Sequence, residues 1–266
     1  MPQAKYLSYR ATHRFSALAL DYLDHKESLK TFYQFTPDLK GLEAAIEARK
    51  QFPVNRKTLV EVLQKQYQHL PEEALVTENI QSLAQENTFT ICTAHQPNLG
   101  TGYLYFVFKI LHAVSMAEAL KKLHPECHFV PVYYIGSEDA DLEELGQFRF
   151  GGEKFVWAAD GQTGAVGRMK TESLQPLLKT LFSKFGPPGE NMDALQALLH
   201  EAYSEHNTIA HATQYLVHRL FGKYGLVVLD PDVADLKRGF IPAMKEDLLQ
   251  HTSLALAEKS IAELAE

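Results

Sequence analysis

Polar side chains gather in a short loop that directly follows an apolar, β-branched run at residues 89–92. The loop holds four hydrogen-bonding residues and two glycines: Thr93, His95, Gln96, Asn98, Gly100 and Gly102. Glycine lets a backbone approach a ligand closely and adopt positive φ. A long apolar helix is predicted to begin near Gly102, and the free N–H groups of its first turn favour an anion. The loop alone is consistent with a phosphate or nucleotide site, and equally with a well-capped structural turn.

Lys109 is the only charged residue between Gly102 and Glu118 in this predicted helix. A cation in so apolar a helix requires a partner or a ligand. The alternative is a side chain that extends along the helix edge to reach water. For His95 the corresponding alternative is a histidine hydrogen-bonded to the backbone.

A second polar group follows the apolar run at 129–135, where the sequence reads GSEDAD. Glu138, Asp139 and Asp141 place three carboxylates within four residues, and these must be balanced by cations, backbone donors or water. They suit a substrate amine, a ribose or water-bound Mg²⁺. The structural alternative is a helix start that Ser137 caps and the acids stabilise. We favour function for Glu138 and Asp139, and the structural interpretation for Asp141.

The elements that must position these residues alternate between strands and helices. Apolar runs near 89–93, 129–135 and 226–229 are separated by helical patterns, which predicts an α/β fold with a parallel sheet. In such sheets ligands bind outside the carboxyl ends of the strands. Both polar groups follow strands, and so do Asp230 and Asp232, which are minor candidates.

The composition restricts the class of protein. The chain of 266 residues carries a formal charge of −7, which argues against nucleic-acid binding. It has two cysteines, Cys92 and Cys127, and this low number suits a reducing cytoplasm. We expect no metal site, because the twelve histidines form no HExxH or similar motif. No apolar run has the length of a membrane span.

Three ordered blocks resemble the BshC family, the cysteine ligases of bacillithiol biosynthesis. They read TAHQPNLGTGYLYFVFKI, VPVYYIGSEDADLEEL and FGKYGLVVLDPDVADLK. The first block matches the family pattern at Thr93, Gln96, Gly102, Leu104, Tyr105 and Lys109. The second matches at Pro131, Val132, Glu138, Asp139 and Asp141.

The resemblance implies a ligase that adds L-cysteine to glucosaminyl-malate, with ATP (or bound ADP) and Mg²⁺ as cofactors. The fold would be a Rossmann-like parallel sheet with helices on both faces. Residues 1–87 would form a helical N-terminal region and 88–150 the first part of the core. Residues 151–206 would be an inserted connecting segment, 207–251 a return to the core, and 252–266 the start of a helical, coiled-coil region. We expect this chain to be the front portion of such a protein, and the full-length form to be a homodimer through the helical region.

The site residues follow from the loop chemistry and the resemblance together. Glu138, Asp139 and His95 would be catalytic. The cofactor would be bound by Thr93, Gln96, Asn98, Gly100, Gly102, Tyr105, Lys109 and Asp141.

The chain departs from the family pattern at four positions. Ala94 and His95 replace a glycine and a glutamine, Tyr103 replaces a proline, and Ala140 replaces the histidine of an EDHD motif. The loss of that histidine favours one other hypothesis, and the order of strand, polar loop and helix suggests another. One is a non-catalytic nucleotide-binding or assembly module, and the other is a nucleotidylyltransferase-like enzyme.

Overall fold

The computed structural model describes residues 5–265 and divides them into two compact units. One unit contains residues 55–242 and holds all the strands. The other contains residues 5–54 together with 243–265 and is helical. The candidate site residues all lie in the first unit.

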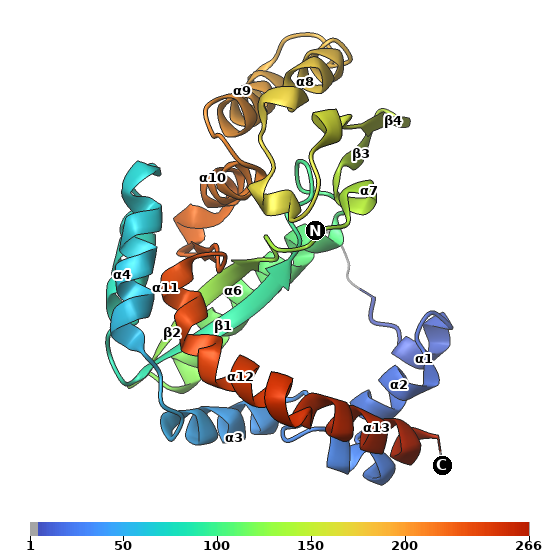
Figure 1. Cartoon of the computed structure of the whole chain (residues 1–266), viewed down its shortest axis with the longest axis vertical. Helices are drawn as coiled ribbons and strands as arrows, with labels where there is room; N and C mark the ends of the chain where they lie inside the picture. Colours follow the sequence, from blue (N-terminus) through green and yellow to red (C-terminus); the bar gives the residue numbers. More distant parts are fainter. Residues whose placement is uncertain (1–4, 266) are drawn as a thin grey trace. The chain divides into compact units, whose positions relative to one another are not determined.

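A three-stranded parallel sheet forms the centre of the first unit (Figure 1). Its strands are β1 (Thr88–His95), β2 (His128–Ile135) and β5 (Val227–Leu229), in the order β1-β2-β5. The register pairs Thr93 with Tyr133 and Tyr133 with Val228. The predicted strands and their parallel arrangement are confirmed.

Helices cover both faces of this sheet, as predicted. On one face, α6 (Tyr105–Leu123) and α10 (Ile209–Phe221) bury their apolar sides against Tyr133, Ile135 and Val228. On the other face, α4 (Arg56–Gln66) and α5 (Ala74–Ser82) pack on Val130, Val132 and Val227 of β2 and β5. The residues of β1 on this face, Thr90, Cys92 and Ala94, are exposed. Successive side chains of a strand point to opposite faces, so a strand that is apolar throughout needs cover on both sides.

The outer edge of β5 is occupied by side chains from the end of α4 and the residue after it. The Gln66 amide donates to the Asp230 carbonyl (2.7 Å) and accepts from the Asp230 N–H (3.2 Å). The Tyr67 hydroxyl accepts from the Val228 N–H at 2.7 Å. These bonds replace the partners that a further strand would offer. At the other end of the sheet, within the described residues, β1 pairs with β2 alone.

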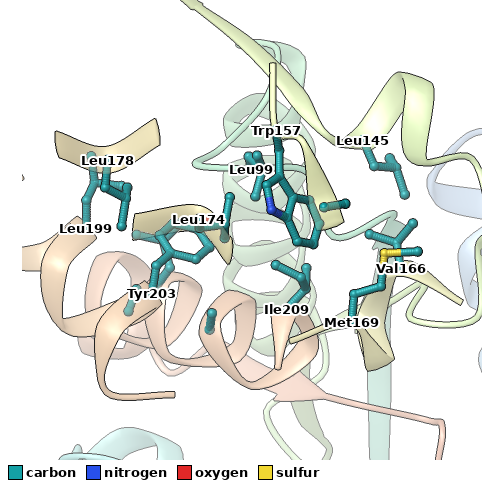
Figure 2. Packing of buried hydrophobic residues seen from close by; sticks show 14 of the residues in the cluster. Leu99, Leu145, Trp157, Val166, Met169, Leu174, Leu178, Leu199, Tyr203 and Ile209 are labelled. Atoms are coloured by element: carbon teal, nitrogen blue, oxygen red, sulfur yellow. The ribbon is translucent and has the colours of Figure 1, made fainter. Parts of the chain in front are cut away.

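The segment between β2 and α10 lies beyond the carboxyl ends of β1 and β2 (Figure 1). It contains α7 (Leu142–Leu145), the hairpin of β3 (Gln147–Phe150) and β4 (Glu153–Val156), and the helices α8 (Gln175–Phe182) and α9 (Glu190–Ser204). The glycines of residues 151–170 predict hairpins or a loop excursion, and a hairpin is present: Gly151 and Gly152 turn it with φ of +58° and +84°. Figure 2 shows the apolar cluster that holds this segment together, including Trp157, Leu174 and Tyr203.

The helical unit contains α1 (Tyr9–Thr12), α2 (Ala17–Leu23), α3 (Leu39–Lys50) and α13 (Thr252–Leu264). Between the sheet and α13 the chain forms α11 (Ala234–Lys237) and α12 (Ile241–Gln250). None of the helices in residues 5–265 has the length and apolar character needed to cross a bilayer. The domain boundaries proposed from the sequence stay predictions.

The sequence predicts Thr58 as the cap of a helix at 59–69 and Asn207 as the cap of a helix at 207–224, and both predictions are wrong. Asn55, and not Thr58, caps α4, because its side chain accepts from the Thr58 N–H (3.2 Å). Thr208, and not Asn207, caps α10 by accepting from the His211 N–H (3.3 Å). In both cases several residues that favour caps lie close together in the sequence.

Candidate active site at the carboxyl ends of the strands

His95 is the last residue of β1 and its side chain is held from both ring nitrogens. Nδ1 lies 3.2 Å from the Gln96 carbonyl oxygen and Nε2 lies 3.0 Å from the Tyr105 hydroxyl. A carbonyl only accepts, so Nδ1 carries the proton and Nε2 accepts from Tyr105. His95 is 8% exposed, and burial lowers its pKa. The structure therefore presents a neutral imidazole, stacked on the Tyr105 ring at 5.2 Å.

Lys109 reaches back from α6 to the end of β1. Its ammonium donates to the Ala94 carbonyl at 2.6 Å, and no carboxylate of residues 5–265 forms an ion pair with it. An ammonium has three donors, so two remain for water or a ligand. The partner of Lys109 is therefore a backbone carbonyl, and its positive charge lies next to the end of β1, where His95 follows Ala94.

Gln96 and Asp139 connect the ends of β1 and β2. The Gln96 amide donates to an Asp139 carboxylate oxygen at 3.1 Å, and the other oxygen accepts from the Asp141 N–H at 2.8 Å. The Gly136 N–H donates to the His95 carbonyl at 2.8 Å. The two predicted polar groups therefore meet, as expected for neighbouring parallel strands.

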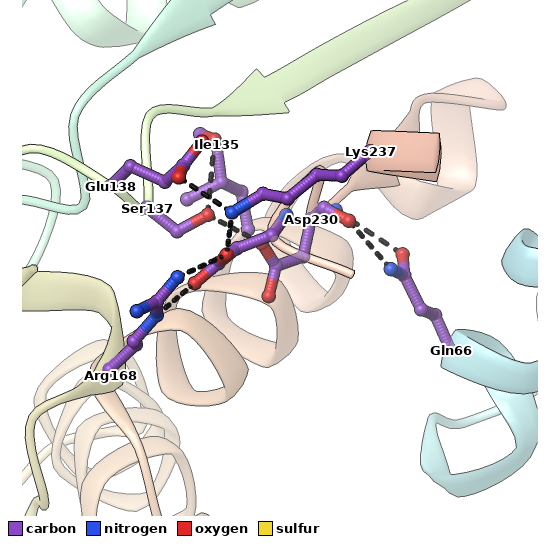
Figure 3. A network of polar contacts seen from close by, with 8 residues as sticks. Gln66, Ile135, Ser137, Glu138, Arg168, Asp230 and Lys237 are labelled. Atoms are coloured by element: carbon purple, nitrogen blue, oxygen red, sulfur yellow. Dashed lines mark hydrogen bonds and ion pairs between the residues drawn. The ribbon is translucent and has the colours of Figure 1, made fainter. Parts of the chain in front are cut away.

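Glu138, which follows β2, belongs to an ionic network that also includes residues after β5, in α11 and in the inserted segment (Figure 3). Lys237 of α11 binds Glu138 (2.6 Å) and also Asp232, which follows β5. Arg168, from the inserted segment, grips the same Asp232 with two nitrogens. Hydrogen bonding from Arg168 lowers the pKa of Asp232 to about 2. The same contacts raise the pKa of Lys237, first through Asp232 and then through Glu138.

The structural alternative for the acidic turn has Ser137 as the cap of the helix after β2, and this part of it is wrong. Its hydroxyl instead donates to the Asp230 carboxylate, also within this network. Asp141 is the cap: it accepts from the Glu144 N–H at 2.9 Å and begins α7. The structural interpretation of Asp141 is confirmed.

The rest of the loop forms a tight turn before α6. Asn98 is 7% exposed, and its Oδ1 has no hydrogen-bond partner among the described residues. Gly102 has φ +60°, and a Cβ there would lie 2.7 Å from the Asn98 amide nitrogen. The Gly100 N–H donates to the Tyr203 hydroxyl at 2.7 Å. These residues shape the turn, whereas Thr93 lies half-buried within β1.

The predicted start of the long helix near Gly102 is wrong. Helix α6 begins at Tyr105, and the N–H groups of Phe106 and Val107 are bonded to the carbonyls of Tyr103 and Leu104. Fewer backbone donors are therefore free for an anion than the sequence indicated. The positive charge at this end of β1 comes chiefly from Lys109.

Sequence reasoning missed Arg168 and Lys237. They contact Asp232 and Glu138 across 64 and 99 residues of chain, and no local spacing signals such contacts. The completed arrangement offers a neutral imidazole, a tyrosine hydroxyl and a partly free ammonium at one end of the sheet. Such a set can hold an anionic group and accept a proton beside it.

Fold and site together define a Rossmann-like α/β protein with polar residues at the strand ends. The family model described as "Bacillithiol biosynthesis BshC, N-terminal Rossmann-like domain" matches residues 3–266. The chain belongs to the BshC family.

Several curated relatives carry the name "Putative cysteine ligase BshC". The relative from Flavobacterium johnsoniae is 42% identical over 262 residues, which cover 98% of this chain and 49% of the relative. The relative from Flavobacterium psychrophilum is 41% identical over 97% of this chain and 49% of its own length. A more distant one, from Koribacter versatilis, is 29% identical over 90% of this chain and 45% of its own. The chain thus spans about half the length of these relatives.

Proposed function

We propose that this chain contributes the N-terminal part of a ligase that adds L-cysteine to glucosaminyl-malate in bacillithiol biosynthesis, driven by ATP. The name of the relatives supports the cysteine ligase activity. The observation that carries the proposal is the cluster of His95, Tyr105 and Lys109 at the end of β1, tied to Asp139 through Gln96.

Forming an amide from a carboxylate requires an activated carboxyl group and a deprotonated amine. A bound nucleotide would supply the activation, and its phosphates would lie against the two free donors of Lys109. Neutral His95 would accept a proton, and it is the candidate base because Ala140 stands where the family pattern has a histidine. Glu138 and Asp139 already bind Lys237 and Gln96, so they would orient a substrate amine with their remaining lone pairs.

The test uses the protein as its gene encodes it, with L-cysteine, glucosaminyl-malate and Mg-ATP. We expect bacillithiol by mass spectrometry together with stoichiometric ATP consumption. Lys109→Met should lower the turnover and weaken ATP binding, whereas Lys122→Met, at the far end of the same helix, should change neither. The proposal fails if the wild-type protein forms no product and consumes no ATP.

A non-catalytic nucleotide-binding module is the second candidate, and Ala140 is the residue that favours it. ATP binding by calorimetry without any turnover would support this module. Release of pyrophosphate with a substrate other than cysteine would instead indicate a nucleotidylyltransferase.

A cytoplasmic homodimer through the helical region is part of the proposal. Leu254, Ile261 and Leu264 of α13 are exposed at spacings of seven and three residues, and an apolar helix face of this kind suits a coiled-coil partner. Sedimentation of the whole protein tests it: Ile261→Glu should shift a dimer towards the monomer, and a monomeric wild-type protein would contradict it.

A further inference from the structure

A partly open, apolar cavity of about 250 Å³ lies between the inserted segment and α10, apart from the cluster around His95. Its walls are leucines and phenylalanines from α8, α9, α10 and the β3–β4 hairpin, among them Leu178, Leu199, Leu216, Phe148 and Phe150. Figure 2 shows Leu178, Leu199 and Tyr203 grouped together at one side of the apolar cluster of this segment. Its only contribution from the loop after β1 is the turn Leu99–Gly102.

Although it is partly open to solvent, this cavity is larger than the voids of a packed interior. Native cores contain few voids larger than a water molecule. An engineered cavity of about 150 Å³ with walls of leucine, isoleucine and phenylalanine binds benzene and stays dry without it. The cavity in this protein is larger and has the same kind of wall, so it has room for an apolar group of several carbons.

Two polar groups at the cavity are free to bind an acceptor. Arg149 of β3 is exposed and lines the cavity, and no carboxylate of residues 5–265 pairs with it. Glu153, the acidic residue of the hairpin, forms an ion pair with Lys184, with 2.9 Å between the carboxylate oxygen and the ammonium nitrogen. The buried Tyr203 hydroxyl accepts from Gly100 N–H, and within the described part of the chain nothing accepts its own proton.

We propose that this cavity binds a small amphipathic carboxylate, with its apolar chain among the leucines and its carboxylate at Arg149. The charge of Arg149 selects an anion, and the walls select an aliphatic or aromatic body. A bound molecule would touch the Gly100 turn, which Tyr203 ties to α9. The proposal is independent of the ligase function.

The test measures binding of octanoate, octanol and acetate to the whole protein by calorimetry. We expect saturable binding of octanoate, about fivefold weaker binding of octanol because an exposed ion pair contributes modestly, and none of acetate. Arg149→Gln should weaken octanoate about fivefold and leave octanol unchanged. Lys154→Gln is the matched control, since Lys154 lies directly opposite Arg149 in the hairpin and does not line the cavity.

A second measurement locates the ligand without any variant. Octanoate should shift the methyl NMR signals of Leu174, Leu178 and Leu199 and the amide signal of Gly100. Leu199→Trp, which fills the space, should abolish binding if it folds. The proposal is overturned if octanoate does not bind, if its shifts map to other leucines, or if both charge variants have the same effect.

Discussion

Asp232→Asn should destabilise the sheet-containing unit in a way that depends on pH. The Asp232 side chain is 8% exposed and binds both Arg168 and Lys237. Its pKa falls from the ordinary 3.8 to about 2 in the folded protein. Each pKa unit corresponds to about 1.4 kcal/mol, so the charge contributes at most about 2.5 kcal/mol. Because Arg168 is 63% exposed and Lys237 is 38% exposed, solvent screens both ion pairs, and we expect a loss of about 1–2 kcal/mol.

The sign of the pH dependence follows from the lowered pKa. The stability that the Asp232 charge contributes is fully present above pH 3.8, the ordinary pKa of the unfolded state. It disappears as the pH falls through about 2, where Asp232 is protonated in the folded state as well. Urea unfolding of wild-type protein and Asp232→Asn at pH 7, 4.5 and 3 measures it. The difference between the two proteins should be constant from pH 7 to 4.5 and smaller at pH 3.

Asp235→Asn is the control for this experiment. Asp235 lies in α11 and also binds an arginine and a lysine, Arg238 and Lys65, but its side chain is 47% exposed. Its removal should cost less than about 0.5 kcal/mol. Equal losses for the two variants, or a loss for Asp232→Asn that persists undiminished at pH 3, would refute the assignment of the ionic network as the source of stability.

Three further outcomes are expected. Gly102→Ala should lower the free energy of unfolding in urea by about 2–3 kcal/mol, and Gly100→Ala by only about 1 kcal/mol. Both glycines have positive φ, but only a Cβ at position 102 would lie against Asn98. Equal losses for the two variants would contradict this reasoning. Gln66→Ala should lower the free energy of unfolding by about 1–2 kcal/mol and speed hydrogen exchange at the Asp230 amide, which loses its acceptor. Unchanged exchange would show that other groups protect the edge of β5. The pKa of His95, measured by NMR, should lie below the ordinary value of 6.5 because its side chain is buried. The buried histidine therefore destabilises the folded protein as the pH falls below 6.5. A titration midpoint at or above 6.5 would contradict the neutral imidazole.

The parts of the fold that sequence predicted are those with local signals. The runs that became β1, β2 and β5 are rich in β-branched and aromatic residues, which favour strands, and those of β2 and β5 are almost wholly buried. Their parallel order then brings Gln96 and Asp139 together, because both follow the carboxyl ends of neighbouring strands. The meeting of the two polar groups was therefore predictable without coordinates.

The parts that sequence missed depend on tertiary contacts or on a choice between equivalent residues. Arg168 reaches Asp232 only because the inserted segment folds back over the strand ends, where the Gly167 N–H donates to the Ser137 carbonyl at 3.0 Å. Ser137 has the chemistry of a helix cap, yet the buried Asp230 carboxylate offers it a stronger, charged acceptor. Intrinsic preference decides such cases only when no tertiary partner competes.

The side chains at the outer edge of β5 have a consequence for how this sheet can grow. Gln66 and Tyr67 already occupy the backbone groups of Asp230 and Val228, so lateral extension on that side would first have to break these bonds. Growth is therefore directional, and any strand that joined the sheet would join beside β1. A parallel strand beside β1 would end next to His95. The residues that follow it would therefore lie close to His95, Tyr105 and Lys109.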